Sequence, residues 1–143
     1  METIGLIPSF GSFAATIIAF VVALSIIVAV HEYGHYIVGR WTGIKADVFS
    51  LGFGPVLFSR VDKHGTRWQV AALPLGGYVK FRGDADPASA GVDQRALAGL
   101  SSKERRATMH GAPLWARAMT VAAGPVFNFV LSIAIFAGFF MFQ

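Results

Sequence analysis

Two histidines and a glutamate stand together at the end of a long apolar run, in the sequence VAVHEYGHYIVGR. His31 and His35 are four residues apart, so on a helix their side chains stack on one face, one turn apart. Two imidazoles in this arrangement can hold one zinc ion, and the neighbouring Glu32 can act as a general base. Zinc lowers the pKa of a bound water toward about 7, and the glutamate can take up its proton and pass it to a leaving amine.

An HExxH motif alone is weak evidence for a metal site, because four-residue matches also arise by chance. Its position at the end of an apolar run is stronger evidence. Charged side chains near the interior of a bilayer are costly and are therefore functional candidates by default. The other two histidines, His64 and His110, lie in polar segments. Neither is expected to be a metal ligand.

The composition indicates a membrane protein, since 55% of the 143 residues are hydrophobic and only 14% are charged. The run from Thr3 to Val30 is uncharged and continues past HEYGH into YIV, which predicts a first transmembrane helix over about Phe13 to Val38. A second uncharged run predicts a second transmembrane helix over Ala118 to Phe142, with a bend at Gly124-Pro125. A secretory signal peptide is disfavoured for the first run, because no basic residue precedes it.

The basic residues all fall between the two runs. The twelve Lys and Arg side chains lie from Arg40 to Arg117, and basic residues near the ends of a span set its orientation. We therefore expect loop 41–117 to be cytoplasmic. The net charge of +4 does not indicate a nucleic-acid partner, because no aromatic-basic signature accompanies it and basic loops beside a lipid bilayer give the same sign.

The segment between the runs is predicted to contain a small β-sheet. VLFSRV and RWQVAAL flank DKHGT, where Gly65 suits a hairpin turn, and YVKFRG can add a strand. A stretch rich in Ala, Gly, Ser and Asp predicts a connector, followed by an interfacial segment with Trp115 at headgroup depth. The predicted parts are 1–40, the first transmembrane helix with HExxH; 41–83, the membrane-associated β-sheet; 84–112, the cytoplasmic connector; and 113–143, the interfacial segment and second transmembrane helix.

The expected fold class is thus an α-helical membrane protein, with two transmembrane helices joined by a cytoplasmic loop that contains a small membrane-associated β-sheet. Four motifs in order resemble the site-2 protease family of intramembrane zinc metalloproteases, in particular its bacterial regulator-of-sigma-E branch. They are HEYGHYIVGR, FSLGFGPVLF, ALPLGGYVKFRGD and AAGPVFNF, and the resemblance covers nearly the whole chain from Ile18. It implies that His31 and His35 bind Zn²⁺, that Glu32 is the general base, and that the protein is a multi-pass protein of the bacterial inner membrane.

The resemblance also implies residues that contact a substrate. They are Gly52, Phe53 and Gly54 in the family's β-element at the mouth of the active site, and Gly76, Gly77 and Tyr78 in the segment Pro74 to Val79. A helical substrate must be unwound before hydrolysis, and an exposed strand edge can pair with the freed backbone. The alternative is a sheet that only anchors the loop to the membrane surface.

Gly124 and Asn128 match the family's Gly-x-x-x-Asn pattern in the second span. Asn128 can donate a hydrogen bond to a substrate or to a developing oxyanion. It can equally form a hydrogen bond between helices, as asparagine commonly does in membrane proteins. The residues leave both roles open.

The family's third zinc ligand, an Asp within an Asp-Gly motif of a later span, has no counterpart here, and Asp47 is only a fallback. Because a catalytic zinc needs three protein ligands, we expect this chain to be the N-terminal portion of a larger protease, inactive by itself. The complete enzyme would cleave single-span membrane proteins such as anti-sigma factors or signal-peptide remnants. The alternatives are a non-catalytic zinc-binding or scaffolding relative, and a transporter fragment whose His and Glu handle ions or protons.

Overall fold

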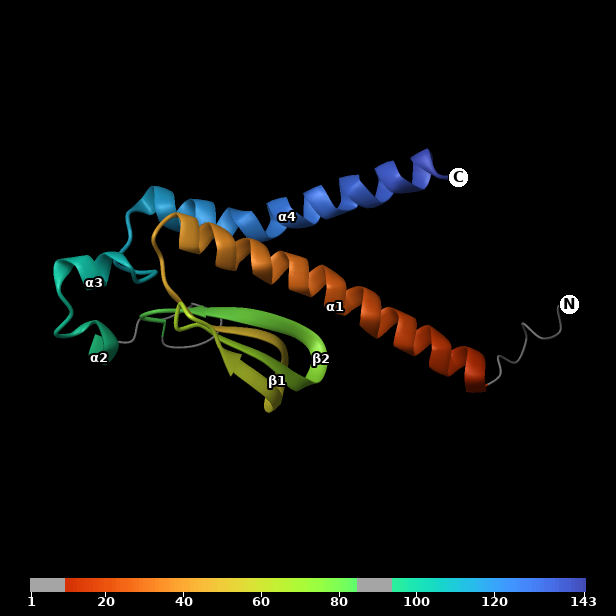
Figure 1. Cartoon of the computed structure of the whole chain (residues 1–143), viewed down its shortest axis with the longest axis horizontal. Coiled ribbons are helices and arrows are strands. Elements are labelled where there is room, and N and C mark those ends of the chain that lie inside the picture. Colours follow the sequence, from red (N-terminus) through yellow and green to blue (C-terminus); the bar gives the residue numbers. More distant parts are fainter. Residues whose placement is uncertain (1–9, 85–93) are drawn as a thin grey trace, which may run out of the picture.

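The computed structural model of the chain describes residues 10–84 and 94–143. Its elements are α1 (Phe10–Trp41), β1 (Ala46–Val61), β2 (Arg67–Phe81), α2 (Gln94–Leu97), α3 (Ser102–Arg106) and α4 (Leu114–Met141). The long helices α1 and α4 lie side by side where α1 ends and α4 begins, and they diverge toward the other end of the molecule (Figure 1). The β1–β2 hairpin packs against α1, and the short helices lie at the closed end (Figure 1).

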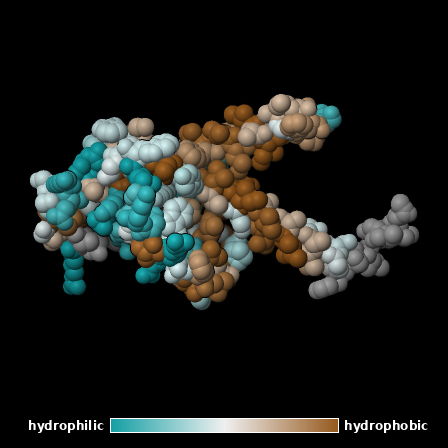
Figure 2. All heavy atoms as spheres, in the orientation of Figure 1, coloured by the Kyte–Doolittle hydropathy of each residue, from teal (hydrophilic) through white to brown (hydrophobic). Residues whose placement is uncertain are grey.

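Both long helices are long and apolar enough to cross a membrane. They expose large apolar side chains over much of their length, and Figure 2 shows these as two hydrophobic arms beyond a hydrophilic end. Both helices are longer than the sequence predicts. The segment predicted to be interfacial is partly helical, because α4 already begins at Leu114.

Helix α1 ends at Trp41 because a glycine-containing motif follows it. Gly43 adopts a φ of +92°, which favours glycine, and the amide of Ile44 donates to the carbonyl of Gly39. The amide of Gly43 donates in turn to Arg40, which completes a Schellman motif. This motif reverses the chain directly after the helix and leads it into β1.

Proline is tolerated inside α4 at the cost of a bend. Pro125 lies within the helix, and Figure 1 shows α4 changing direction part-way along its length. Proline lacks an amide hydrogen and its ring clashes with the carbonyl four residues earlier. The second span therefore bends as predicted, and the helix continues without a break through Pro125 (Figure 1).

The sheet is two-stranded and antiparallel, and a turn containing Gly65, with a φ of +85°, joins its strands. The prediction of three short strands is wrong, since β1 already begins at Ala46 and β2 continues through the Pro-Leu-Gly-Gly stretch to Phe81. The register is irregular, and Phe49 lies opposite both Val79 and Trp68. The hairpin therefore curls back on itself.

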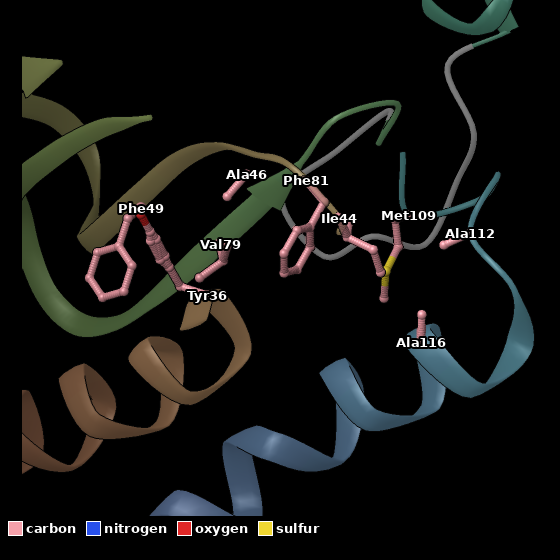
Figure 3. Packing of buried hydrophobic residues seen from close by; sticks show 9 residues of the cluster. All are labelled: Tyr36, Ile44, Ala46, Phe49, Val79, Phe81, Met109, Ala112 and Ala116. Atoms are coloured by element: carbon pink, nitrogen blue, oxygen red, sulfur yellow. The ribbon is translucent and has the colours of Figure 1, made fainter. Parts of the chain in front are cut away.

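The buried apolar cluster joins the end of α1 to the sheet and to the start of α4 (Figure 3). Its members are Tyr36, Ile44, Ala46, Phe49, Val79, Phe81, Met109, Ala112 and Ala116. Trp68 packs at its edge, with its ring 4.5 Å from that of Phe49 and 4.9 Å from that of Tyr36. Burial of aromatic side chains is worth a few kcal/mol each, so this cluster fixes the sheet beside the second half of α1.

The predicted connector 84–112 is only partly described, because residues 85–93 lie outside the described ranges. Its later part contains α2 and α3. A capping box starts α3, in which the hydroxyl of Ser101 accepts from the amide of Glu104 and the carboxylate of Glu104 accepts from the amide of Ser101. The later part of the predicted connector therefore carries two short helices.

Candidate metal centre

His31 and His35 present their Nε2 atoms to one point between α1 and α4. The two atoms are 3.1 Å apart, and the rings are inclined at 83°. Two nitrogen ligands of a tetrahedral zinc ion, each bound at 2.0–2.1 Å, stand about 3.3 Å apart. The spacing of the two imidazoles therefore fits a shared zinc ion.

The other ring nitrogen of His35 is held by the facing helix. Its Nδ1 lies 2.8 Å from the backbone carbonyl oxygen of Thr120. A carbonyl can only accept, so Nδ1 carries the proton and Nε2 keeps a free lone pair for a metal. Sequence reasoning missed Thr120, because a backbone carbonyl is supplied by every residue type.

Asn128 supports His31 in the corresponding way, since its Nδ2 lies 3.0 Å from His31 Nδ1. Its Oδ1 is buried and has no hydrogen-bond partner among the described residues. The two ends of an amide are assigned from their hydrogen bonds. With the amide turned over, Oδ1 accepts from the Nδ1–H of His31 and leaves Nε2 free for a metal ion.

Asn128 therefore forms an interhelical hydrogen bond, the second of the two roles that the sequence left open. The bond ends on a predicted metal ligand, so it orients that ligand as well as joining the helices. A direct role for Asn128 toward a substrate stays a prediction.

Two glycines bring the helices close enough for these contacts. A Cβ atom added at Gly34 would lie 2.6 Å from the carbonyl oxygen of Ala123, so only a glycine allows the two backbones to approach this closely. A Cβ atom at Gly124 would lie 2.5 Å from His35 Nε2 and 2.8 Å from His31 Cε1. The imidazoles therefore pack directly on the backbone of α4, which explains the glycine of the Gly-x-x-x-Asn pattern.

The predicted general base lies between this centre and the sheet. Glu32 is partly buried, and a Cβ atom at Gly77 in β2 would lie 3.6 Å from its Cγ and 2.9 Å from Val28 Cγ1. Val28 precedes Trp41, the end of α1, by 13 residues, which corresponds to about 20 Å of helix. The sheet therefore extends far along the apolar helix and passes the carboxylate.

The other predicted substrate residues gather where the hairpin bends. A Cβ atom at Gly76 would lie 2.6 Å from the ring of Phe53, and that ring stacks on Tyr78 with 6.0 Å between centroids. Gly52 and Gly54 adopt φ values of +90° and +81°. The structure thus brings the six residues together on one part of the sheet, with Gly77 beside Glu32. Contact with a substrate stays a prediction for all six.

No third His, Cys, Asp or Glu joins the histidine pair within the described residues. Asp47 does not group with the histidine pair, so the fallback is wrong, and its carboxylate faces Arg82 at 3.6 Å. His64 donates its backbone amide to Asp62, and His110 faces Asp84 at 3.3 Å. A shallow cavity of about 290 Å³ opens beside His31 along Pro125, Asn128, Phe129 and Ser132 of α4.

Two imidazole Nε2 atoms that face one point beside a carboxylate, between two membrane-length helices, are the arrangement that an HExxH metal site requires. Residues 19–143 match the family model described as peptidase family M50. The chain therefore belongs to this family, the site-2 protease family, whose members are membrane-associated.

Several curated relatives are similar over most of the chain. It is 55% identical over 130 residues to the protein named putative zinc metalloprotease Atu1380 of Agrobacterium fabrum, with 91% of this chain and 34% of that protein covered. It is 58% identical over 125 residues to R01501, named likewise, of Rhizobium meliloti, with 87% and 33% covered. It is 41% identical over 133 residues to metalloprotease MmpA of Caulobacter vibrioides, again with 87% and 33% covered. The chain thus spans about one third of the length of these relatives.

Proposed function

We propose that this chain carries the histidine pair and the general base of a zinc-dependent intramembrane endopeptidase, which acts on single-span membrane proteins in regulated intramembrane proteolysis. One observation carries the proposal. Thr120 and Asn128 of α4 hold the two imidazoles with both Nε2 atoms toward one point, one residue away from a carboxylate that adjoins a strand. A merely structural histidine needs none of this arrangement.

The chain's own residues divide the chemistry among themselves. A zinc ion at the Nε2 atoms would supply Lewis acidity toward water and toward the scissile carbonyl. Glu32 takes the proton of the attacking water and delivers it to the leaving amine. The third protein ligand comes from outside the described residues, where the family resemblance points to an Asp.

The sheet handles the substrate in this proposal. Within the described residues, Gly77 and Tyr78 pair with β1 on one side and with no further strand on the other. An unwound substrate, such as an anti-sigma factor or a signal-peptide remnant, adds its backbone to this edge. Gly76 and Gly77 have no side chains, so the added backbone can lie close to Glu32.

The sheet also suits contact with lipid. Leu57, Phe58 and Leu75 on the hairpin are 70%, 66% and 67% exposed, and the same hairpin passes apolar α1 at Val28. Exposed apolar groups of this size are costly in water and favourable in a bilayer. We place the helices in the bacterial inner membrane and loop 41–117 on its cytoplasmic side.

The test uses a chimaera in which this chain replaces the matching third of a full-length relative. Cleavage of a single-span substrate is followed in proteoliposomes, and bound zinc is measured on the same samples. The expected result is that Glu32→Gln abolishes cleavage while zinc stays bound, and that His35→Ala loses both. A Glu32→Gln chimaera that still cleaves would overturn the proposal. A wild-type chimaera that binds zinc without cleaving any substrate would favour the scaffolding alternative.

A further inference from the structure

A basic cavity of about 780 Å³ lies beside the part of α1 that follows the histidine pair, between the end of α1, the hairpin turn and α3. Five cations from separate parts of the chain line it: Arg40, Lys45, Lys63, Arg82 and Lys103. They are five of the chain's twelve Lys and Arg residues. Figure 2 shows hydrophilic side chains gathered at this end.

The acidic groups near this cavity are few in the described part of the chain. Glu104 is the carboxylate in the described lining, and it accepts from the amide of Ser101 in the capping box. Asp47 faces Arg82 at 3.6 Å, with both side chains 40% exposed. A sphere of this cavity's volume is about 11 Å across, close to the distance over which salt screens charge. Even with Asp47 beside Arg82 and Glu104 in the lining, the cations outnumber the carboxylates, so an anion in the cavity would reduce their mutual repulsion.

Membrane orientation alone does not explain this arrangement. Orientation needs basic residues near the ends of the spans, which Arg40 and Lys45 already supply. Lys63 lies in the hairpin turn and Arg82 directly follows β2, yet both line the same cavity. Convergence on one cavity is what a bound anion requires.

The cavity's surroundings identify the anion's source. Arg40 in its lining precedes Trp41, which is 72% exposed, and Trp115 near the start of α4 is 56% exposed. Exposed tryptophans beside apolar helices mark the headgroup level of a bilayer. A phosphate-bearing group at this level belongs most simply to a lipid, and basic pockets on the cytoplasmic side of membrane helices bind such headgroups.

We propose that this cavity binds the phosphate headgroup of an anionic phospholipid. The inference rests on the membrane placement in the proposed function and not on catalysis. Bound there, the lipid neutralises the converging cations and joins α1, the hairpin and α3. It thereby holds the hairpin beside Glu32 from a cavity that neither histidine of the pair lines.

The test is native mass spectrometry of the full chain in non-ionic detergent, with phosphatidylglycerol or phosphatidylcholine of the same acyl chains added. A triple variant, Lys45→Gln with Lys63→Gln and Lys103→Gln, removes three exposed cations of the lining. The matched control, Arg60→Gln with Arg67→Gln and Lys80→Gln, removes three cations outside it. We expect the triple variant to bind phosphatidylglycerol at least about tenfold less than the control, with phosphatidylcholine unaffected.

Equal binding by the two variants would overturn the proposal, and so would equal retention of phosphatidylcholine and phosphatidylglycerol. Displacement of the lipid by millimolar inorganic phosphate would assign the cavity to a small free anion instead of a headgroup. The Glu32→Gln chimaera separates the lipid proposal from the proposed protease function, because zinc content and cleavage test only the latter. That variant keeps the lipid if the cavity is a headgroup site, whatever its activity.

Discussion

The helix seam and the sheet of this protein are built in opposite ways. In the seam between α1 and α4, Gly34 and Gly124 leave no room for a methyl group, and both histidines have partners on the opposite helix. In the sheet, the bend around Phe53 carries glycines at positive φ, and large apolar side chains such as Leu75 are exposed. In the proposed function, the rigid seam fixes the metal centre in advance and the open sheet receives the substrate.

The largest expected effect comes from filling the seam. Gly124→Ala places a methyl group 2.5 Å from His35 Nε2, so the imidazole or the helix must shift. We expect zinc affinity of the chimaera to fall about 100-fold or more and the protein to lose about 1–3 kcal/mol of stability from overpacking. Chelator competition and thermal unfolding measure the two effects.

Gly138 provides a matched control on the same helix, because a Cβ atom there meets nothing within 4 Å. Gly138→Ala should leave zinc affinity unchanged and improve helix propensity by up to about 1 kcal/mol. Equal zinc affinities for the two alanine variants would show that the seam is not tight.

A smaller effect is expected from removing the support of His31. Asn128→Leu deletes the hydrogen bond to Nδ1, and loss of such a support typically lowers metal affinity about 10–100-fold. Asn128→Asp keeps an acceptor and should retain most of the affinity. If Asn128→Leu instead binds zinc normally and slows cleavage, the residue acts on the substrate.

The sheet side should respond in catalysis and not in metal binding. Gly77→Ala puts a methyl group 2.6 Å from the carbonyl oxygen of Ser50 and 2.9 Å from Val28, which pushes β2 away from Glu32. We expect cleavage by the chimaera to fall about tenfold, with bound zinc unchanged. Ala72→Ser, an exposed position on the same strand, is the control. A loss of zinc in Gly77→Ala would mean that the two regions are not separable.

The smallest effect concerns the hairpin turn. Asp62 accepts hydrogen bonds from Trp68 Nε1 and from the amides of Thr66 and His64. Burial acts to raise the pKa of Asp62, but these bonds stabilise the carboxylate and the pKa is lowered overall. Its contribution to stability is therefore present above its ordinary pKa and is lost as the pH falls through the lowered value.

Asp62→Asn should accordingly lower the free energy of unfolding by about 1 kcal/mol at neutral pH. The free energy of unfolding of this variant should also fall less steeply as the pH is lowered. Urea unfolding of the chain in detergent, followed by far-UV circular dichroism at a series of pH values, measures both changes. If the free energy of unfolding falls equally steeply with decreasing pH in the variant and the wild type, this role of the turn is contradicted.

Sequence alone predicts the parts of this molecule that depend on composition and short spacing. The uncharged runs predict α1 and α4, and HExxH predicts the histidine pair, because a helix repeats about every four residues. Strand lengths were not predictable, since glycines in the Pro-Leu-Gly-Gly stretch suggest a break that packing on α1 overrides. The role of Thr120 was invisible because it uses a backbone carbonyl. The basic cavity depends on residues distant in sequence that only the fold brings together.

The most direct test of the account is the number of imidazole ligands on zinc in the chimaera, measured by X-ray absorption spectroscopy. We expect two imidazole nitrogens at about 2.0 Å from zinc in the wild type, and no zinc bound at this site in His35→Ala. We also expect two in Glu32→Gln, because the glutamate is a base and not a ligand. An unchanged imidazole count in His35→Ala would show that zinc is held elsewhere and would contradict the metal centre described between α1 and α4.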